Sequence, residues 1–305
     1  MKQQMKDKIK VLRYAMAFVI AGTITRVNAQ TEILITGGTS TYLGDLGGKP
    51  GFGSNDFSDL DYESTRYMVG LGLRQNIGNR LAVRGTVYYT RLTADDKYTS
   101  NVERKMRNLN FFTPVLGGDA VVEWKFGNGG SRFSTPNWYV FAGIGYFKFD
   151  PKTNYNGSKV RLQPLGTEGQ FFMPGKSAYK LGSFTVPFGI GYKFKPTKFG
   201  YLSVQVDGRK TFTDYIDDVS TQYVDKTQLL ASNGPVAVAL SDRSNPDGRI
   251  IGFSDPGAIR GNPNHNDNFF FMSVQYNIIL GNTDHSAGFS KGGRGKKGKN
   301  SCYSF

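Results

Sequence analysis

The densest group of residues that could do chemistry lies in the stretch RKTFTDYIDDVS, residues 209–220. Three carboxylates, Asp214, Asp217 and Asp218, follow two cations there, and Asp225 comes soon after. Together they could supply the several oxygen ligands that Ca²⁺ prefers. Their spacing lacks the Asp-x-Asp-x-Asp-Gly pattern of a calcium loop. We therefore predict no metal ligands in this stretch and expect a solvated strand end.

Catalysis has few candidate residues in this chain. The only histidines are His265, in GNPNHNDN, and His285, and the only cysteine is Cys302. A hydrolase triad needs a base held beside its nucleophile. Nitrogen and sulfur metal sites need several His or Cys residues at short spacing. The sequence has neither pattern, so we predict no catalytic residue, no metal site and no cofactor.

The first 29 residues have the organisation of an export signal. Five cations precede the apolar run YAMAFVIAGTI (14–24), and VNA (27–29) ends it with small residues at the −3 and −1 positions of a cleavage site. The alternative is an anchoring or buried helix, but the run is shorter than the roughly 18 residues of a membrane helix. We predict a signal peptide at 1–29, cleaved after Ala29.

Apolar and polar residues alternate along eight segments. In LAVRGTVYYTR (81–91), Leu81 and Val83 share a face with Val87, whereas Arg84 lies on the opposite face. Such a period of two indicates strands with one apolar and one polar face. The other segments are 31–38, 66–76, 109–126, 138–149, 184–194, 202–212 and 269–279. Pro187 lies on the polar face of its segment and is expected to mark a bulge, because proline has no N–H to donate.

The connections between these segments alternate in length, as in outer-membrane barrels. The short ones are 76–80, 128–137 and 195–200, and the long ones are 39–65, 94–108, 150–178 and 213–267. A soluble sandwich is the alternative, but it would expose apolar side chains in register over eight strands. We predict an all-β fold: an eight-stranded antiparallel transmembrane outer-membrane β-barrel spanning residues 30–282, with short periplasmic turns and long extracellular loops.

An eight-stranded barrel has a lumen just wide enough for side chains. Charged residues on the polar faces are available to fill it, and their opposite charges can neutralise each other. They are Arg74, Arg84, Glu123, Lys125, Asp207 and Arg209. A filled lumen argues against a porin and favours structural or assembly work over transport.

Several motifs in order resemble one family of proteins. They are STYLGDLG (40–47), RNLNFFTPVLGGDAVVEWKF (107–126), WYVFAGIGYFKFDPKTNY (138–155), RLQPLGTEGQ (161–170), YKLGSFTVPFGIGYKFK (179–195), RKTFTDYIDDVS (209–220), RGNP (260–263) and NDNFFFMSVQYNI (266–278). The chain resembles the small outer-membrane β-barrels of the Bacteroidota, the family that includes the PorG barrel of the type IX secretion apparatus. The resemblance covers almost the whole mature chain.

The resemblance implies a non-enzymatic, PorG-like component or accessory of type IX secretion in the outer membrane of a Gram-negative bacterium. Its partners would be outer-membrane lipid and periplasmic ring components of the secretion system. Two alternatives remain open. The chain could be a stand-alone surface barrel whose extracellular loops bind an external ligand or partner, or it could be a small transporter.

Two further features bear on these alternatives. We expect RLQPLGTEGQ and RKTFTDYIDDVS to lie on neighbouring loops, where Arg161 and Glu168 pair with charged groups of the adjacent loop and order an extracellular cap. Residues 283–305 include the basic run GGRGKKGK and form a predicted flexible periplasmic tail. Such a tail could contact phosphate, lipid head groups or an acidic protein. Nothing in the sequence implies nucleic-acid binding.

Overall fold

The computed structural model describes residues 31–47, 64–77, 80–99, 101–126, 138–194, 199–244 and 252–280. The predicted signal peptide and basic tail lie outside these residues. The elements in chain order are β1 (Thr31–Leu43), β2 (Arg66–Ile77), β3 (Leu81–Asp95), α2 (Val102–Arg107), β4 (Asn110–Lys125), β5 (Trp138–Phe149), β6 (Lys152–Tyr155), β7 (Ser158–Arg161), β8 (Gly182–Lys193), β9 (Gly200–Thr211), α3 (Lys226–Ser241) and β10 (Asn268–Leu280).

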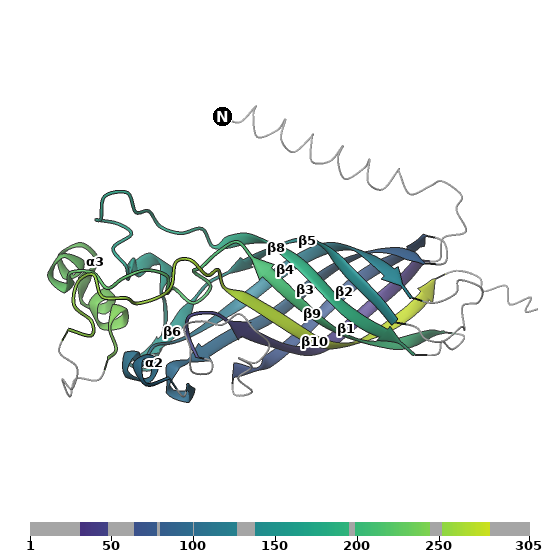
Figure 1. The fold of residues 1–305 in the computed structure, drawn as a ribbon, viewed down its shortest axis with the longest axis horizontal. Helices are drawn as coiled ribbons and strands as arrows, with labels where there is room; N and C mark the ends of the chain where they lie inside the picture. The colour runs from purple at the N-terminus through teal and green to yellow at the C-terminus, as the bar shows by residue number, and fades with distance from the viewer. Residues whose placement is uncertain are drawn as a thin grey trace, which may run out of the picture.

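Eight of these strands close into an antiparallel barrel (Figure 1). β1, β2, β3, β4, β5, β8, β9 and β10 pair in that order, and β10 pairs back to β1. Each barrel strand therefore has a hydrogen-bonded neighbour on both sides. The predicted eight-stranded barrel is confirmed, and each strand overlaps the segment that the alternation identified.

The barrel is apolar outside and polar inside. Large apolar side chains are exposed on the outward face of every barrel strand, among them Ile35, Leu71, Val87, Val122, Ile144, Phe188, Val206 and Val274. Charged residues alternate with them and point inward, where Arg74 and Glu123 are fully buried. A protein that folds in water has the opposite arrangement. The pattern suits a barrel surrounded by hydrocarbon.

Pro187 of β8 causes no bulge. The register with β9 continues through the pair Pro187↔Arg209. On the other side, β5 pairs Ala142↔Phe188 and Gly145↔Thr185 in one register, with the two intervening pairs missing. The missing N–H of proline therefore interrupts the ladder without inserting an extra residue, and the predicted bulge is wrong.

The two ends of the barrel differ. At one end, on the left in Figure 1, the long connections carry α2, α3, β6 and β7 and form a folded cap. β6 continues β5 along β4, because Phe112↔Lys152 keeps the register of Val115↔Phe149. In the described part of the chain, no helix is long and apolar enough to cross a membrane. The connections that join β2 to β3, β4 to β5 and β8 to β9 are short in sequence and belong to the other end.

Close packing inside the barrel requires glycine at defined positions. A Cβ on Gly191, which faces inward from β8, would lie 2.3 Å from Cζ of Tyr139. We expect Gly191→Ala to lower the free energy of unfolding by about 1–3 kcal/mol, as overpacking of a filled core does. Urea unfolding of the detergent-refolded protein measures this. Gly37→Ala is the control, because a Cβ there meets nothing within 4 Å, and equal effects of the two substitutions would contradict the packing argument.

Candidate functional site

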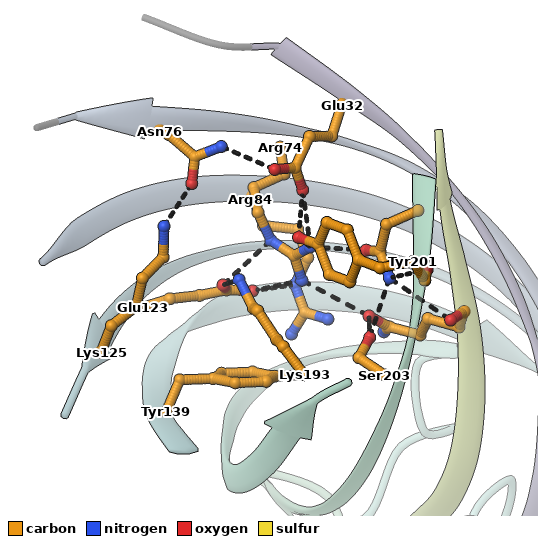
Figure 2. Close-up of polar contacts among 12 residues, drawn as sticks. Glu32, Arg74, Asn76, Arg84, Glu123, Lys125, Tyr139, Lys193, Tyr201 and Ser203 are labelled. Carbon is orange, nitrogen blue, oxygen red and sulfur yellow. Dashed lines mark hydrogen bonds and ion pairs between the residues drawn. The ribbon is translucent and has the colours of Figure 1, made fainter. Parts of the chain in front are cut away.

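A network of buried ion pairs crosses the lumen near the short-turn end (Figure 2). At its centre the carboxylate of Glu123, on β4, receives Arg74 at 2.9 Å, Arg84 at 3.1 Å and Lys193 at 3.1 Å. These side chains come from β2, β3 and β8, so one carboxylate joins strands around the barrel. Glu32 of β1 adds a second carboxylate, 3.0 Å from Arg74.

Neutral polar groups complete this network. Tyr201 donates to Glu32 at 2.6 Å, and Asn76 donates to the same carboxylate at 2.7 Å. Arg84 donates to the amide oxygen of Gln205 at 2.7 Å. The Lys193 ammonium lies 4.7 Å from the centre of the Tyr139 ring. Amide oxygens and ring faces thus stabilise the cations that the two carboxylates do not fully neutralise.

A second ionic layer lies nearer the loop end. Arg209 of β9 pairs with Asp119 at 2.8 Å and Asp207 at 3.0 Å. Its guanidinium lies 4.3 Å from the centre of the Tyr88 ring and 4.5 Å from that of Phe271. Beyond it, inward aromatic side chains contact one another inside the barrel. They are Tyr42, Phe111, Phe147, Phe149, Phe269 and Phe271.

The sequence predicted most of the charged residues that line the lumen. Arg74, Arg84, Glu123, Asp207 and Arg209 are buried inside the barrel as predicted. Lys125 also faces inward and donates to Asn76. Glu32, Asp119 and Lys193 were not among the predicted lumen charges. All three lie on the inward face by the period of two, so a stricter count of positions would have found them.

The acidic stretch of residues 214–218 is buried, so the predicted solvated strand end is wrong. Asp217 and Asp218 are 1% and 0% exposed, because the cap packs over them. Asp218 accepts hydrogen bonds from Thr167 and Tyr179, both at 2.6 Å. Asp217 accepts one from the Tyr42 hydroxyl at 2.8 Å, and that hydroxyl also contacts Asp267.

Glu168 is the centre of the cap. Its carboxylate accepts hydrogen bonds from the Ser220 amide at 2.9 Å, the Thr221 hydroxyl at 2.7 Å and the Arg260 guanidinium at 2.8 Å. The predicted pairing of Glu168 with the neighbouring loop is confirmed. For Arg161 it is wrong, because β7 folds back onto β6 and brings Arg161 to Asp150 at the start of its own loop, at 2.8 Å.

Arg107 joins the connections that follow β1 and β3 to the longest connection, through hydrogen bonds of its guanidinium. This residue, at the end of α2, donates to Asp96 at 2.8 and 2.9 Å. It also donates to the backbone oxygens of Asp45, after β1, and Arg260, at 2.7 and 2.6 Å. Side chains therefore link all four long connections into one packed unit.

The structure describes some of the residues that the sequence offered as candidate metal ligands or bases. No group of three or more His, Cys, Asp or Glu residues could hold a metal ion in the ranges that the structure describes. Asp225, the fourth candidate calcium ligand, instead caps α3 and accepts from the Gln228 amide. His265 is exposed. His285 and Cys302 lie outside the described residues.

Burial changes the protonation of the cap. It raises the pKa of Asp218 to about 6 and that of Asp214 to about 9, because burial disfavours the charged form of a carboxyl. The pKa values of Asp217 and Asp267 are raised well above the ordinary value, by burial first and then by neighbouring carboxyls. Burial and neighbouring carboxyls thus both favour the neutral form of the two carboxyls that contact the Tyr42 hydroxyl.

The Glu123 network gives a prediction for stability. Glu123→Gln removes the carboxylate that pairs with three buried cations. Of the three, only Arg74 keeps another carboxylate partner, Glu32. We expect a loss of about 3–5 kcal/mol in the free energy of unfolding, as for other broken buried pairs. Urea unfolding measures the loss. The control is Glu103→Gln, at an exposed position of α2. If both substitutions had a similar small effect on the free energy of unfolding, the network would contribute nothing to stability.

The cap carboxyls predict a pH dependence. Their pKa values are raised above the ordinary value of 3.8, so the folded cap binds more protons than the unfolded loops. This contribution to stability is fully present below about pH 4 and is lost as the pH rises through about 6 and about 9. Limited proteolysis of residues 212–267 at pH 5, 7 and 9 should show increasing cleavage.

Asp214→Asn keeps the shape of the protonated carboxyl and should weaken the pH dependence between pH 7 and 9. Asp255→Asn, an exposed position in the same connection, should leave it unchanged. Cleavage rates that do not change with pH in the wild-type protein would contradict the assignment.

The chain was compared with family models, with curated proteins and with solved structures, and only the solved structures include similar proteins. No family model matches the chain, and no curated protein matches it. It is similar to the crystal structure of Ail, the attachment invasion locus protein of Yersinia pestis, with a TM-score of 0.37, 10% identity and coverage of 83% of this chain and 99% of that one. Neisserial surface protein A is similar with a TM-score of 0.37 and 11% identity, over 83% of this chain and 99% of that one. The N-terminal β-barrel domain of Pseudomonas aeruginosa OprF is similar with a TM-score of 0.32 and 9% identity, over 81% of this chain and 96% of that one.

Proposed function

We propose that this chain is a non-enzymatic outer-membrane β-barrel that closes its own lumen and works as a PorG-like component or accessory of the type IX secretion apparatus. The observation that carries the proposal is the combination of an apolar exterior with a lumen filled by ion pairs and aromatic rings. Such a barrel anchors itself in a bilayer and offers its two ends to partners.

The outward face supports a place in a membrane. Aromatic side chains are exposed at the short-turn end, including Trp124, Phe126, Trp138 and Phe194, and at the loop end, including Tyr67, Tyr89, Tyr146 and Phe184. Two aromatic girdles around an apolar band are typical of outer-membrane barrels. The barrel strands have 12 to 16 residues, more than the 9–11 that a tilted strand needs to cross a bilayer. With the N-terminus in the periplasm, the cap lies outside the cell.

The filled lumen argues against the transporter alternative. Glu123 and its three cations obstruct the passage at one level, Arg209 and its carboxylates at a second, and the aromatic layer at a third. A solute would have to break several buried ion pairs to pass. Support for a role in assembly is therefore stronger than support for transport.

The secretion role rests on the sequence resemblance. Three of its motifs contain Glu168, Asp218 and Arg260, which hold the cap together. The resemblance thus includes residues that build the structure of the loops. A place beside the periplasmic ring of the apparatus is the function that such a barrel would have within that family.

A surface-binding role is the second candidate. The cap is held by buried bonds, yet it exposes Phe171, Met173, Leu230 and Ile259. Rigid apolar side chains of this kind could contact an external partner. Crosslinking from these positions in whole cells tests this candidate.

Insertion and closure can be measured together. The purified mature protein should migrate faster in an unheated than in a heated detergent gel, because the closed barrel resists the detergent. In planar bilayers the inserted protein should show no stable conductance, since the lumen is filled. Recovery as a soluble periplasmic protein would contradict the membrane location. Channels that pass small sugars would favour the transporter alternative over a role in assembly.

The periplasmic tail provides a test of the partner. Residues 286–305 include five cations, and exposed charge contacts are weak and screened by salt. Deletion of these residues should leave the barrel inserted and reduce co-purification of periplasmic ring components, most clearly at low salt. Unchanged pull-downs, with crosslinks from residues 212–267 to extracellular material, would favour the surface-binding alternative.

A further inference from the structure

A group of cations lies on the outward face of the barrel, directly beyond the apolar band at the loop end. We call it the basic rim patch. It consists of Arg91 on β3, Lys148 on β5, Lys152 on β6, and Lys159 and Arg161 on β7. None of these side chains bonds to Glu123 or Arg209 in the lumen, or to Glu168 or Arg107 in the cap.

The strand registers place these residues on one face. Lys148 is paired with Leu116, an exposed outward residue of β4. Because β6 continues β5 in the same register, Lys152 faces the same way as Lys148. Lys152 is paired with Arg161 across the β6–β7 hairpin, and Asn154 is paired with Lys159. Alternation within the two strands puts both β7 cations on the face of Lys152.

Arg91 joins the patch through an aromatic ring. It lies on the outward face of β3 with Tyr89, and its guanidinium carbon is 4.1 Å from the centre of the Phe112 ring. The ammonium of Lys159 is 5.9 Å from the same ring centre. Two cations therefore lie against one ring of β4, near enough to act on a single anionic group.

The patch has more positive charge than its own carboxylate can neutralise. Asp150 pairs with both Lys152, at 3.1 Å, and Arg161, at 2.8 Å. Lys148 and Lys159 are exposed. Within the described ranges, no carboxylate forms an ion pair with Arg91, Lys148 or Lys159. Asp150 thus pairs with two of the five cations, and the other three have no carboxylate partner in the described residues.

The position of the patch along the barrel places it at the level of lipid head groups. Arg91 and Lys148 each follow by two residues an exposed outward tyrosine, Tyr89 and Tyr146. Aromatic side chains of this kind lie at the level of lipid head groups. At the opposite end, the described outward-facing strand residues include aromatic side chains such as Trp124 and Trp138 but no cation. Among the described outward-facing strand residues, cations therefore occur at the loop end of the barrel and not at the short-turn end.

We propose that the basic rim patch binds the phosphate groups of an acidic glycolipid in the outer leaflet. This inference rests on the proposed outer-membrane location. The patch flanks the apolar band directly, so a lipid could place its acyl chains against Leu116 and Ile144 and its phosphates against the cations. Free phosphate fits less well, because it would use the charges and none of the apolar surface beside them.

The test uses the full mature chain refolded in detergent. The probe is a diglucosamine glycolipid with two phosphates, compared with the same lipid without phosphates, and native mass spectrometry measures the bound fraction. Lys148→Gln/Lys159→Gln should weaken binding of the phosphorylated lipid roughly fivefold for each lysine removed, as expected for a cation near an anionic lipid surface. The matched control is Lys105→Gln/Lys226→Gln, which removes two cations from the cap.

The expected result is preference for the phosphorylated lipid, loss of that preference in the patch variant, and retention in the control. Equal binding by the patch variant and the wild-type protein would overturn the proposal. So would equal binding of the two lipids, or displacement of the lipid by millimolar inorganic phosphate. Heat-modifiable migration is recorded for each sample: a chain that does not form an inserted barrel refutes the proposed function, whereas an inserted barrel without lipid preference refutes only this inference.

Discussion

The bond between Glu123 and its three cations is the interaction on which the inside of this barrel depends. A sheet that turns its apolar side chains outward must turn its polar side chains inward, where little water remains to solvate them. Removing charges from water has a large free-energy cost unless each charge meets partners. Glu123 meets this constraint by joining β2, β3, β4 and β8 at one point.

The cap repeats the same solution outside the barrel. Glu168 receives two backbone amides, one hydroxyl and the Arg260 guanidinium. In both places one buried carboxylate collects donors from segments far apart in sequence. The consequence in the lumen is closure, and the consequence in the cap is a fixed arrangement of four connections. Loops held in this way can present the same surface continuously, which flexible loops cannot do.

Strand positions were predictable because hydrocarbon outside and polar groups inside impose a period of two on the sequence. The same regularity identified most lumen charges, including Arg74 and Arg209. The cap has no such period. Its acidic residues looked solvated because their partners are remote: Tyr42 reaches Asp217 across 175 positions, and Thr167 reaches Asp218 across 51. Local patterns contain no information about contacts of that separation, so only the folded chain reveals the burial of these carboxyls.

A barrel with a filled lumen can act only through its surfaces. Its outward band contacts lipid chains, its two rims contact head groups, and its ends contact whatever lies on either side of the membrane. The rims differ in charge, since Arg91 and Lys148 have no outward-facing counterpart among the described strand residues at the short-turn end. Under the proposed phosphate binding, the loop-end rim contacts lipid through these cations, whereas the described outward-facing strand residues at the other rim contact it through aromatic side chains such as Trp124 and Trp138.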